Sequence, residues 1–287
     1  MGDFARELWR RLESLHAVTY FAPEPVERAA SIGVKGFWRT YFGFRGAPLG
    51  ACSAATAQAA FFGFAPDMVA RAVPSVWGLA MPDALIGARA ASAATALRRL
   101  APTEVEALAR DAWATGVLVR AIELAPAGNL PLFLANRDLA LRDDPVEALW
   151  QLTTTLREQR GDGHVANWTS RGCSPLDVAV LFVGAGGTSR DALQPNRGWT
   201  DDEWHEALER NEDAGLLTSE GVVTDAGAAL IAEVEDATDR LAEAPFRELG
   251  DEDRARLLRS LTPAAMAVTE ANLIPQVNPM GVPLLGD

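Results

Sequence analysis

The sequence predicts an all-α fold, and two observations carry this prediction. Apolar side chains recur at the three- and four-residue spacing of helices, as at Phe4, Leu8, Leu12 and Leu15 within the predicted helix 3–15. Alternating apolar and polar residues, which are typical of half-buried strands, are nearly absent. With 287 residues, 48% of them hydrophobic, the chain can bury a sizeable core.

Prolines and capping residues delimit the helices of the first half. They predict helices at 24–32, 34–45, 54–62 with Ser53 as N-cap, from Ala65-Pro66 onward, and 83–100. Pro102-Thr103, with Glu106 three residues after the threonine, resembles a capping box for a single helix at 104–125.

The second half predicts more helices and one β element. Helices are expected at 145–159, ended by Gly161 and Gly163, then at 163–171, at 174–183 after Ser174, at 200–213 after Thr200, from Thr224 to about 244, and within 250–274. Between two of them, residues 216–224 predict a short β-hairpin. This order is typical of a winged helix-turn-helix region. We therefore expect two domains, 1–143 and 144–287.

Composition excludes several classes of protein. The net charge of −13 disfavours binding to nucleic acid or anionic membranes. No apolar run reaches the length of a membrane span, and the N-terminus lacks a signal-peptide pattern, so a cytoplasmic location is expected. Two cysteines are too few for a disulfide framework.

The helix before the predicted wing would enter the major groove if this region read DNA. Residues 200–213 carry seven acidic side chains against the single cation Arg210, and the wing has no Arg or Lys. Phosphates would be repelled, so we expect no DNA binding through this helix. A basic surface elsewhere is the alternative, from Arg6, Arg10, Arg11, Arg98 and Arg99.

Two segments hold candidate site residues. His16 and Tyr20 lie four residues apart, on one face of a helix, and Arg45 lies among aromatic residues, which suits a planar or anionic ligand. Alternatively, Arg45 pairs with a carboxylate and ties two helices together.

The second segment, 157–164, is the most polar of the chain. Glycines flank Asp162 and would let a loop present Asp162 and His164 together, so that the carboxylate orients the imidazole as a general base. Glu158, Arg160 and nearby Trp168 are the expected ligand contacts. The alternative is a structural junction in which Asp162 caps the next helix.

We expect these segments to converge on one pocket, with His16, Asp162 and His164 as catalytic residues. Tyr20, Arg45, Glu158, Arg160 and Trp168 would bind a small molecule. No cofactor and no metal are expected, although a metal site from His16, His164 and Glu24 or Asp162 is an alternative.

Five segments resemble an actinobacterial helix-turn-helix family whose members are often labelled MarR-like or SalK-type. They are HAVTYFAPE (16–24), YFGFRGAPLG (41–50), REQRGDGHVA (157–166), RGWTDDEW (197–204) and ATDRLAEAPF (237–246). The resemblance implies a helical region joined to a winged helix, and its label implies DNA binding; it assigns no catalytic residue. The expected function is small-molecule binding, with cofactor-free catalysis or sequestration in specialised metabolism. The alternative is a ligand-responsive MarR-like regulator. A homodimer is an open alternative to a single chain.

Overall fold

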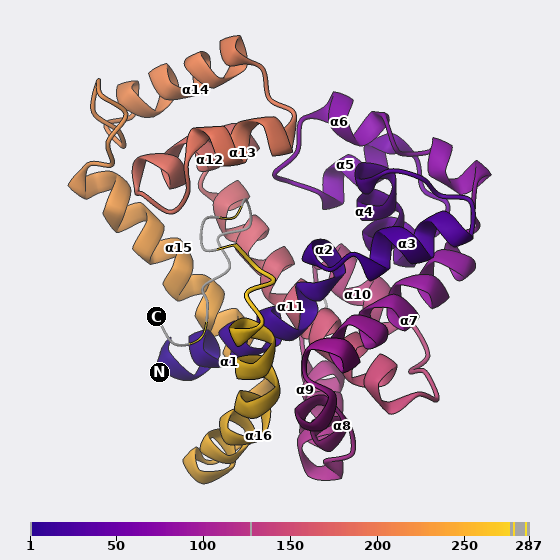
Figure 1. Ribbon diagram of the computed structural model, residues 1–287. Coiled ribbons are helices and arrows are strands. Elements are labelled where there is room, and N and C mark those ends of the chain that lie inside the picture. Colours follow the sequence, from indigo (N-terminus) through magenta and orange to yellow (C-terminus); the bar gives the residue numbers. More distant parts are fainter. Residues whose placement is uncertain (1, 127, 276–277, 279–284, 286–287) are drawn as a thin grey trace.

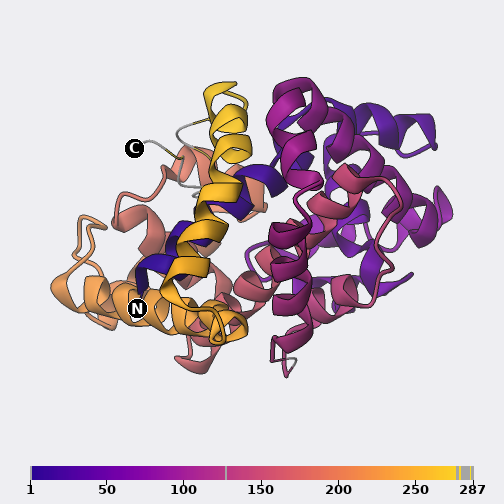
Figure 2. The same cartoon turned by 90° about the horizontal axis from the view of Figure 1, so that it is seen from below.

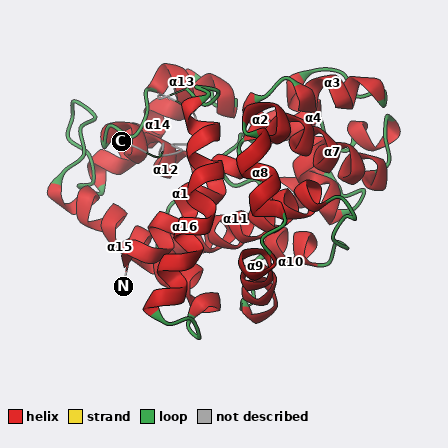
Figure 3. Ribbon diagram, turned by 60° about the horizontal axis from the view of Figure 1, so that its bottom comes forward, coloured by secondary structure: helices red, strands yellow, loops and turns green. Residues whose placement is uncertain are grey.

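The computed structural model describes residues 2–126, 128–275, 278 and 285 (Figure 1). All regular elements in this part of the chain are helices, as Figure 3 shows, so the all-α prediction is confirmed.

Sixteen α-helices and three 3₁₀-helices make up the described part of the chain. They are α1 (Gly2–His16), α2 (Val18–Phe21), α3 (Glu24–Ser31), α4 (Phe37–Gly46), η1 (Ala47–Leu49), α5 (Ala54–Ala60), α6 (Pro66–Ala70), η2 (Ser75–Gly78), α7 (Pro82–Leu100), α8 (Pro102–Ala109), α9 (Ala112–Leu124), α10 (Pro131–Arg137), α11 (Pro145–Ser170), α12 (Pro175–Gly184), α13 (Arg190–Arg197), α14 (Asp201–Asp213), α15 (Asp225–Glu243), η3 (Ala244–Phe246) and α16 (Asp251–Glu270).

The long helix α11 is the axis of the molecule. It packs against α1, α7, α8, α9 and α10, and its second half also lies along α15. Figure 1 shows α2–α7 on one side of this axis and α12–α14 on the other, and Figure 2 shows α16 lying across α1. Most buried apolar residues of the described chain belong to three clusters: one around α11, α1 and α16, one among α3–α7, and one among α12–α15. A small fourth cluster joins Ala17 and Ile274.

The predicted break at Gly161 and Gly163 is wrong, because α11 continues through both glycines to Ser170. Glycine lowers helix propensity by only about 1 kcal/mol, which packing on several sides outweighs. A Cβ at Gly163 would lie 3.3 Å from Leu241 Cδ1 on α15. This glycine therefore serves close packing of two helices and forms no hinge.

The single helix expected at 104–125 is also wrong, because α8 and α9 are separate. The side chain of Asp111 caps α9 by accepting bonds from the backbone N–H groups of Trp113 and Ala114. Glu106 accepts a bond from Arg98 Nε at 2.7 Å instead of closing a capping box. Caps at Ser53, Ser174, Thr200 and Thr224 are confirmed.

The expected β-hairpin at 216–224 is not formed. A single antiparallel bridge joins Leu217 and Val223, and the Thr218 hydroxyl accepts the backbone N–H of Val222. The N–H of Val223 donates to the carbonyl of Gly184 on α12. The backbone N–H groups of Thr218 and Thr224 donate to the carbonyls of Val222 and Leu216, so the two arms pair only around this bridge and form no strands among the described residues.

The boundary at residue 143 stays a prediction. It falls in the link between α10 and α11, but the largest apolar cluster contains residues from both sides of it.

Candidate functional site

Helix α11 presents a stripe of polar side chains toward the first half of the chain. Gln151, Thr154, Glu158 and Asp162 follow one another at three- and four-residue spacing, so they lie on one face of the helix. All four residues are buried. Buried polar groups need partners, and those partners come from α1, α4, α7 and α10.

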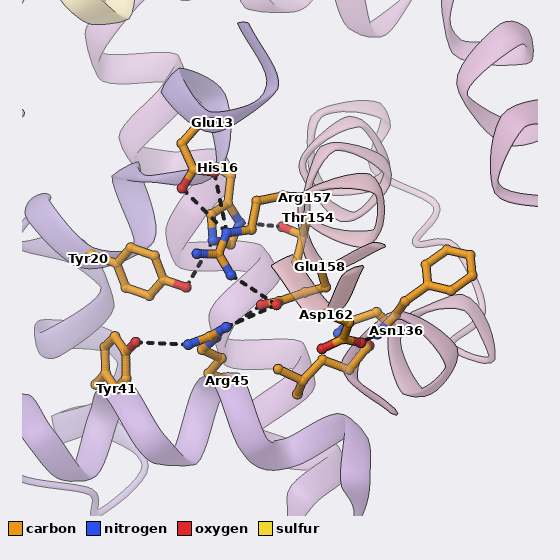
Figure 4. A network of polar contacts seen from close by, with 12 residues as sticks. Glu13, His16, Tyr20, Tyr41, Arg45, Asn136, Thr154, Arg157, Glu158 and Asp162 are labelled. Carbon is orange, nitrogen blue, oxygen red and sulfur yellow. Dashed lines mark hydrogen bonds and ion pairs between the residues drawn. The ribbon is translucent and has the colours of Figure 1, made fainter. Parts of the chain in front are cut away.

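His16 ends α1 and contacts this stripe directly (Figure 4). Its Nδ1 lies 2.9 Å from Thr154 Oγ1, and its Nε2 lies 2.9 Å from the hydroxyl of Tyr20. The imidazole is nearly parallel to the indole of Trp150. Burial, and then the charge of Arg157, hold the pKa of His16 well below its ordinary value. The ring is therefore neutral at pH 7 and holds both neighbours through one donor and one acceptor.

Glu158 is the centre of the ion pairs. Arg45 on α4 donates Nε and Nη2 to its two carboxylate oxygens, each at 3.0 Å, and Arg157 Nη1 donates at 2.9 Å. Burial favours the neutral acid, but both guanidinium groups outweigh it and hold the pKa of Glu158 well below its usual range. Arg157 also contacts Glu13 on α1, at 3.3 Å.

A small cavity lies between α1, α2, α4, α7 and α11. Its volume for water-sized molecules is about 20 Å³, enough for one water and less than a metabolite needs. Figure 4 shows the side chains of Tyr20 and Tyr41 directed toward this network. The lining residues are His16, Thr19, Tyr20, Thr40, Tyr41, Phe44, Arg45, Arg89, Trp150, Thr154 and Glu158.

Asp162 lies one turn beyond Glu158 and does not line the cavity. Its Oδ2 accepts the backbone N–H of Phe133 at 2.9 Å, in the first turn of α10. Burial, with the nearby charge of Glu158, raises the pKa of Asp162 to about 7. Asp162 thus caps a helix, although one that precedes it in the chain rather than the next one.

His164, Arg160 and Trp168 form a second cluster, against α15. Trp168 Nε1 donates to His164 Nε2 at 2.9 Å, and His164 Nδ1 lies 3.3 Å from the Thr238 hydroxyl. Arg160 donates to Asp239 at 3.0 Å. Burial lowers the pKa of His164 to about 4.

The predicted convergence of His16 and His164 is wrong. His16 contacts Thr154, and His164 lies ten residues further along the same helix, a rise of about 15 Å. The prediction depended on a loop at Asp162 that would turn His164 back, and α11 has no such loop. His16, Tyr20, Arg45 and Glu158 are brought together; Arg160, His164 and Trp168 are not part of that group.

Arg89, Thr154 and Arg157 are among the contributors to the site that the sequence analysis did not identify. The polar spacing along α11 would have indicated Thr154 once the helix was taken as continuous. Arg89 stands within an alanine-rich segment, and a lone arginine there is a signal for a buried polar contact. Arg157 belongs to the polar segment 157–164, but the sequence assigned it no role of its own.

The acidic helix α14 turns its charges outward. Trp204, Ala207 and Asn211 face the interior, while its only arginine, Arg210, pairs with Asp177 at 2.8 Å. The exposed face that would meet DNA phosphates therefore has no free cation among the described residues.

Comparison with known proteins assigns the chain to a family. A family model matches residues 5–275, which is nearly the whole chain. The chain belongs to a helix-turn-helix family. No curated protein matches it, and no solved structure does.

In the described part of the chain, no helix combines the length and apolar character needed to cross a bilayer. Among the same described residues, no group of three or more His, Cys, Asp or Glu side chains is arranged to hold a metal ion.

Proposed function

We propose that this helix-turn-helix family member binds a small molecule in the cavity between α1, α2, α4, α7 and α11. The observation that carries the proposal is the buried polar wall formed by His16, Tyr20, Arg45 and Glu158 around that space. A ligand site is usually an apolar cavity with a few convergent polar groups, and Phe44 and Trp150 supply apolar wall here. The small volume requires the half-buried side of the cavity, at Thr19 and Tyr20, to move when a ligand enters.

Binding or sequestration fits the side chains better than proton-transfer catalysis. The pKa of His16 is held well below neutrality by burial, and burial also raises the pKa of Tyr20. Neither group changes protonation near pH 7, which an efficient general acid or base must do. A role in specialised metabolism and a cytoplasmic location belong to the same proposal.

The test asks whether compounds still bind when a larger side chain at residue 19 blocks the cavity. A library of metabolite-sized compounds is screened for those that raise the melting temperature, and each is measured again with Thr19→Trp and with the matched Thr19→Ser. We expect the compounds to lose their effect on Thr19→Trp and to keep it on Thr19→Ser. Equal stabilisation of both variants would locate binding elsewhere and overturn the proposal.

A second candidate function, a ligand-responsive MarR-like regulator, is favoured by one connection. Tyr41 accepts a bond from Arg45 Nη1 at 3.1 Å and also bonds Arg197 on α13. The backbone carbonyl of Arg197 in turn accepts the N–H of Ala65, before α6. A ligand that displaces Tyr41 would thus disturb the helix-turn-helix region. DNA binding that changes on adding a cavity ligand, and not in Tyr41→Phe, would support this function.

A further inference from the structure

Arg89 is a buried cation without an ion pair. It lies on α7 with 2% of its surface exposed. Nη1 donates to the carbonyl of Phe44 at 3.1 Å, and Nη2 donates to the side-chain oxygens of Asn136 at 2.7 Å and Gln151 at 3.0 Å. Its Nε has no hydrogen-bond partner among the described residues. Every acceptor it contacts there is neutral, and its guanidinium lies 5.5 Å from the centre of the Trp150 ring, so no carboxylate pairs with it beside the cavity it lines.

The other charges around the cavity do not balance it. Arg45 and Arg157 share Glu158, and Arg157 also contacts Glu13, so with Arg89 three guanidinium groups face two carboxylates. Arg197, which bonds the cavity-lining Tyr41, adds a further positive charge. Burial lowers the pKa of Arg89 to about 10, which leaves it protonated at neutral pH. The cavity wall is therefore positive inside a chain whose net charge is −13.

We propose that the cavity receives the carboxylate of a small monocarboxylic acid, with Arg89 Nε donating to it. The inference rests on the proposed function and names the chemical class of its ligand. One negative charge would pair with the charge of Arg89, and a buried cation is stabilised most by a hydrogen-bonded anion. The limited volume admits a carboxylate head, while the remainder of the acid extends past Thr19 and Tyr20 toward solvent.

The first test compares carboxylates with neutral amides of the same shape on the unaltered protein. Acetate and butyrate are titrated against acetamide and butyramide at constant ionic strength, with the melting temperature as readout. We expect a saturable rise with the acids and at least tenfold weaker binding of the amides. Equal responses to acid and amide, or no saturable response to the acids, would overturn the inference.

The second test removes the cation. Arg89→Met keeps the length of the side chain and is expected to abolish the response to acetate and butyrate. Arg99→Met, at an exposed position of the same helix, is expected to leave it intact. An unchanged acetate titration in Arg89→Met contradicts the assignment. If Arg89→Met does not fold, the comparison of acids with amides on the unaltered protein still tests whether the cavity binds a carboxylate.

The two proposals fail in different ways. If compounds bind in a manner sensitive to Thr19→Trp but acids have no advantage over amides, the cavity is a ligand site and the carboxylate assignment is wrong. If acids bind equally well to Thr19→Trp and Thr19→Ser, the cavity itself is not the site and both proposals are wrong.

Discussion

Glu158 shows how a single residue holds the site together. Its side chain is 1% exposed and accepts three bonds from two arginines on different helices. A buried carboxylate is tolerated only when it is paired, and removing one member of such a group leaves the others with uncompensated charge.

Glu158→Gln should therefore destabilise the protein strongly. The amide keeps the size of the side chain but leaves Arg45 and Arg157 without their shared anion, at a cost of about 3–5 kcal/mol. Urea unfolding measures the change. Glu123→Gln is the control, because its pair with Arg120 is 60% exposed on both sides and should contribute under about 1 kcal/mol. A loss in Glu158→Gln no larger than in the control would contradict the description of the network.

Asp162 gives the fold a pH dependence. Its pKa of about 7 lies above the ordinary value of 3.8, because burial and Glu158 disfavour its charge. Between these values the folded state holds a proton that the unfolded state has released. The stabilisation is complete below pH 4, falls as the pH rises to about 7, and is constant above that.

Asp162→Asn should remove this dependence. We expect the free energy of unfolding of the variant, minus that of the original protein, to increase from pH 5 to pH 8 by about 1–3 kcal/mol, since one pK unit corresponds to about 1.4 kcal/mol. The exposed Asp138→Asn is the matched control. A difference that stays flat, or falls, over this range would show that Asp162 is ionised throughout.

At the scale of the element, α11 can be tested as an uninterrupted helix. A Cβ added to Gly161 would meet its nearest neighbour, Arg157 Nη1, at 3.5 Å, an ordinary contact. Gly161→Ala should therefore stabilise the protein by about 0.5–1 kcal/mol through helix propensity alone. Thermal unfolding measures this. A destabilised variant would indicate that the helix is broken or strained at this position.

Gly184 is the opposite case, at the end of α12. A Cβ there would lie 2.6 Å from Leu217 Cδ2 and 2.7 Å from the carbonyl oxygen of Gly221. Gly184→Ala should force the 216–224 segment away from α12 and cost about 1–3 kcal/mol. Gly116→Ala on α9, which meets open space, should not destabilise. Equal stability of the two variants would mean that the segment does not dock on α12.

Local chemistry explains which elements could be predicted from the sequence. The caps at Ser174 and Thr200 depend on residues three positions apart, so the sequence contains all that is needed. Gly161 and Gly163 were misread, because what keeps α11 helical is its packing against α1, α10 and α15. The expected hairpin is reduced to one bridge, between Leu217 and Val223, and the outward N–H of Val223 bonds a carbonyl of α12, which is distant in sequence.

At the scale of the whole molecule, contacts of the site between near neighbours in sequence could be predicted, whereas contacts between distant residues could not. His16 and Tyr20 share a contact because they are four residues apart, which the sequence shows. The sequence left open whether Arg45 contacts a ligand or pairs with a carboxylate. Its pairing with Glu158, 113 positions away, depends on how α4 lies against α11. His164 was assigned to the wrong cluster because a helix end was expected near Gly161, whereas α11 continues to Ser170.

The distribution of charge over the whole molecule bears on DNA binding. The helix that a winged helix-turn-helix protein would place in the major groove is α14, whose exposed face carries acidic side chains and whose Arg210 is held by Asp177. Since contacts between cations and phosphates supply most non-specific affinity, this face should repel the duplex.

We therefore expect no salt-sensitive binding to duplex DNA at near-physiological ionic strength, measured by fluorescence anisotropy over a range of salt concentrations. A charge-reversed variant, with Asp202, Glu206 and Glu209 changed to Lys, serves as the positive control. These positions are exposed, so the variant should fold and bind DNA at low salt, with an affinity that falls steeply as salt is added. Tight, sequence-selective binding by the original protein that Arg210→Ala abolishes would contradict the prediction, because it would show that the single arginine of α14 contacts DNA despite its acidic neighbours.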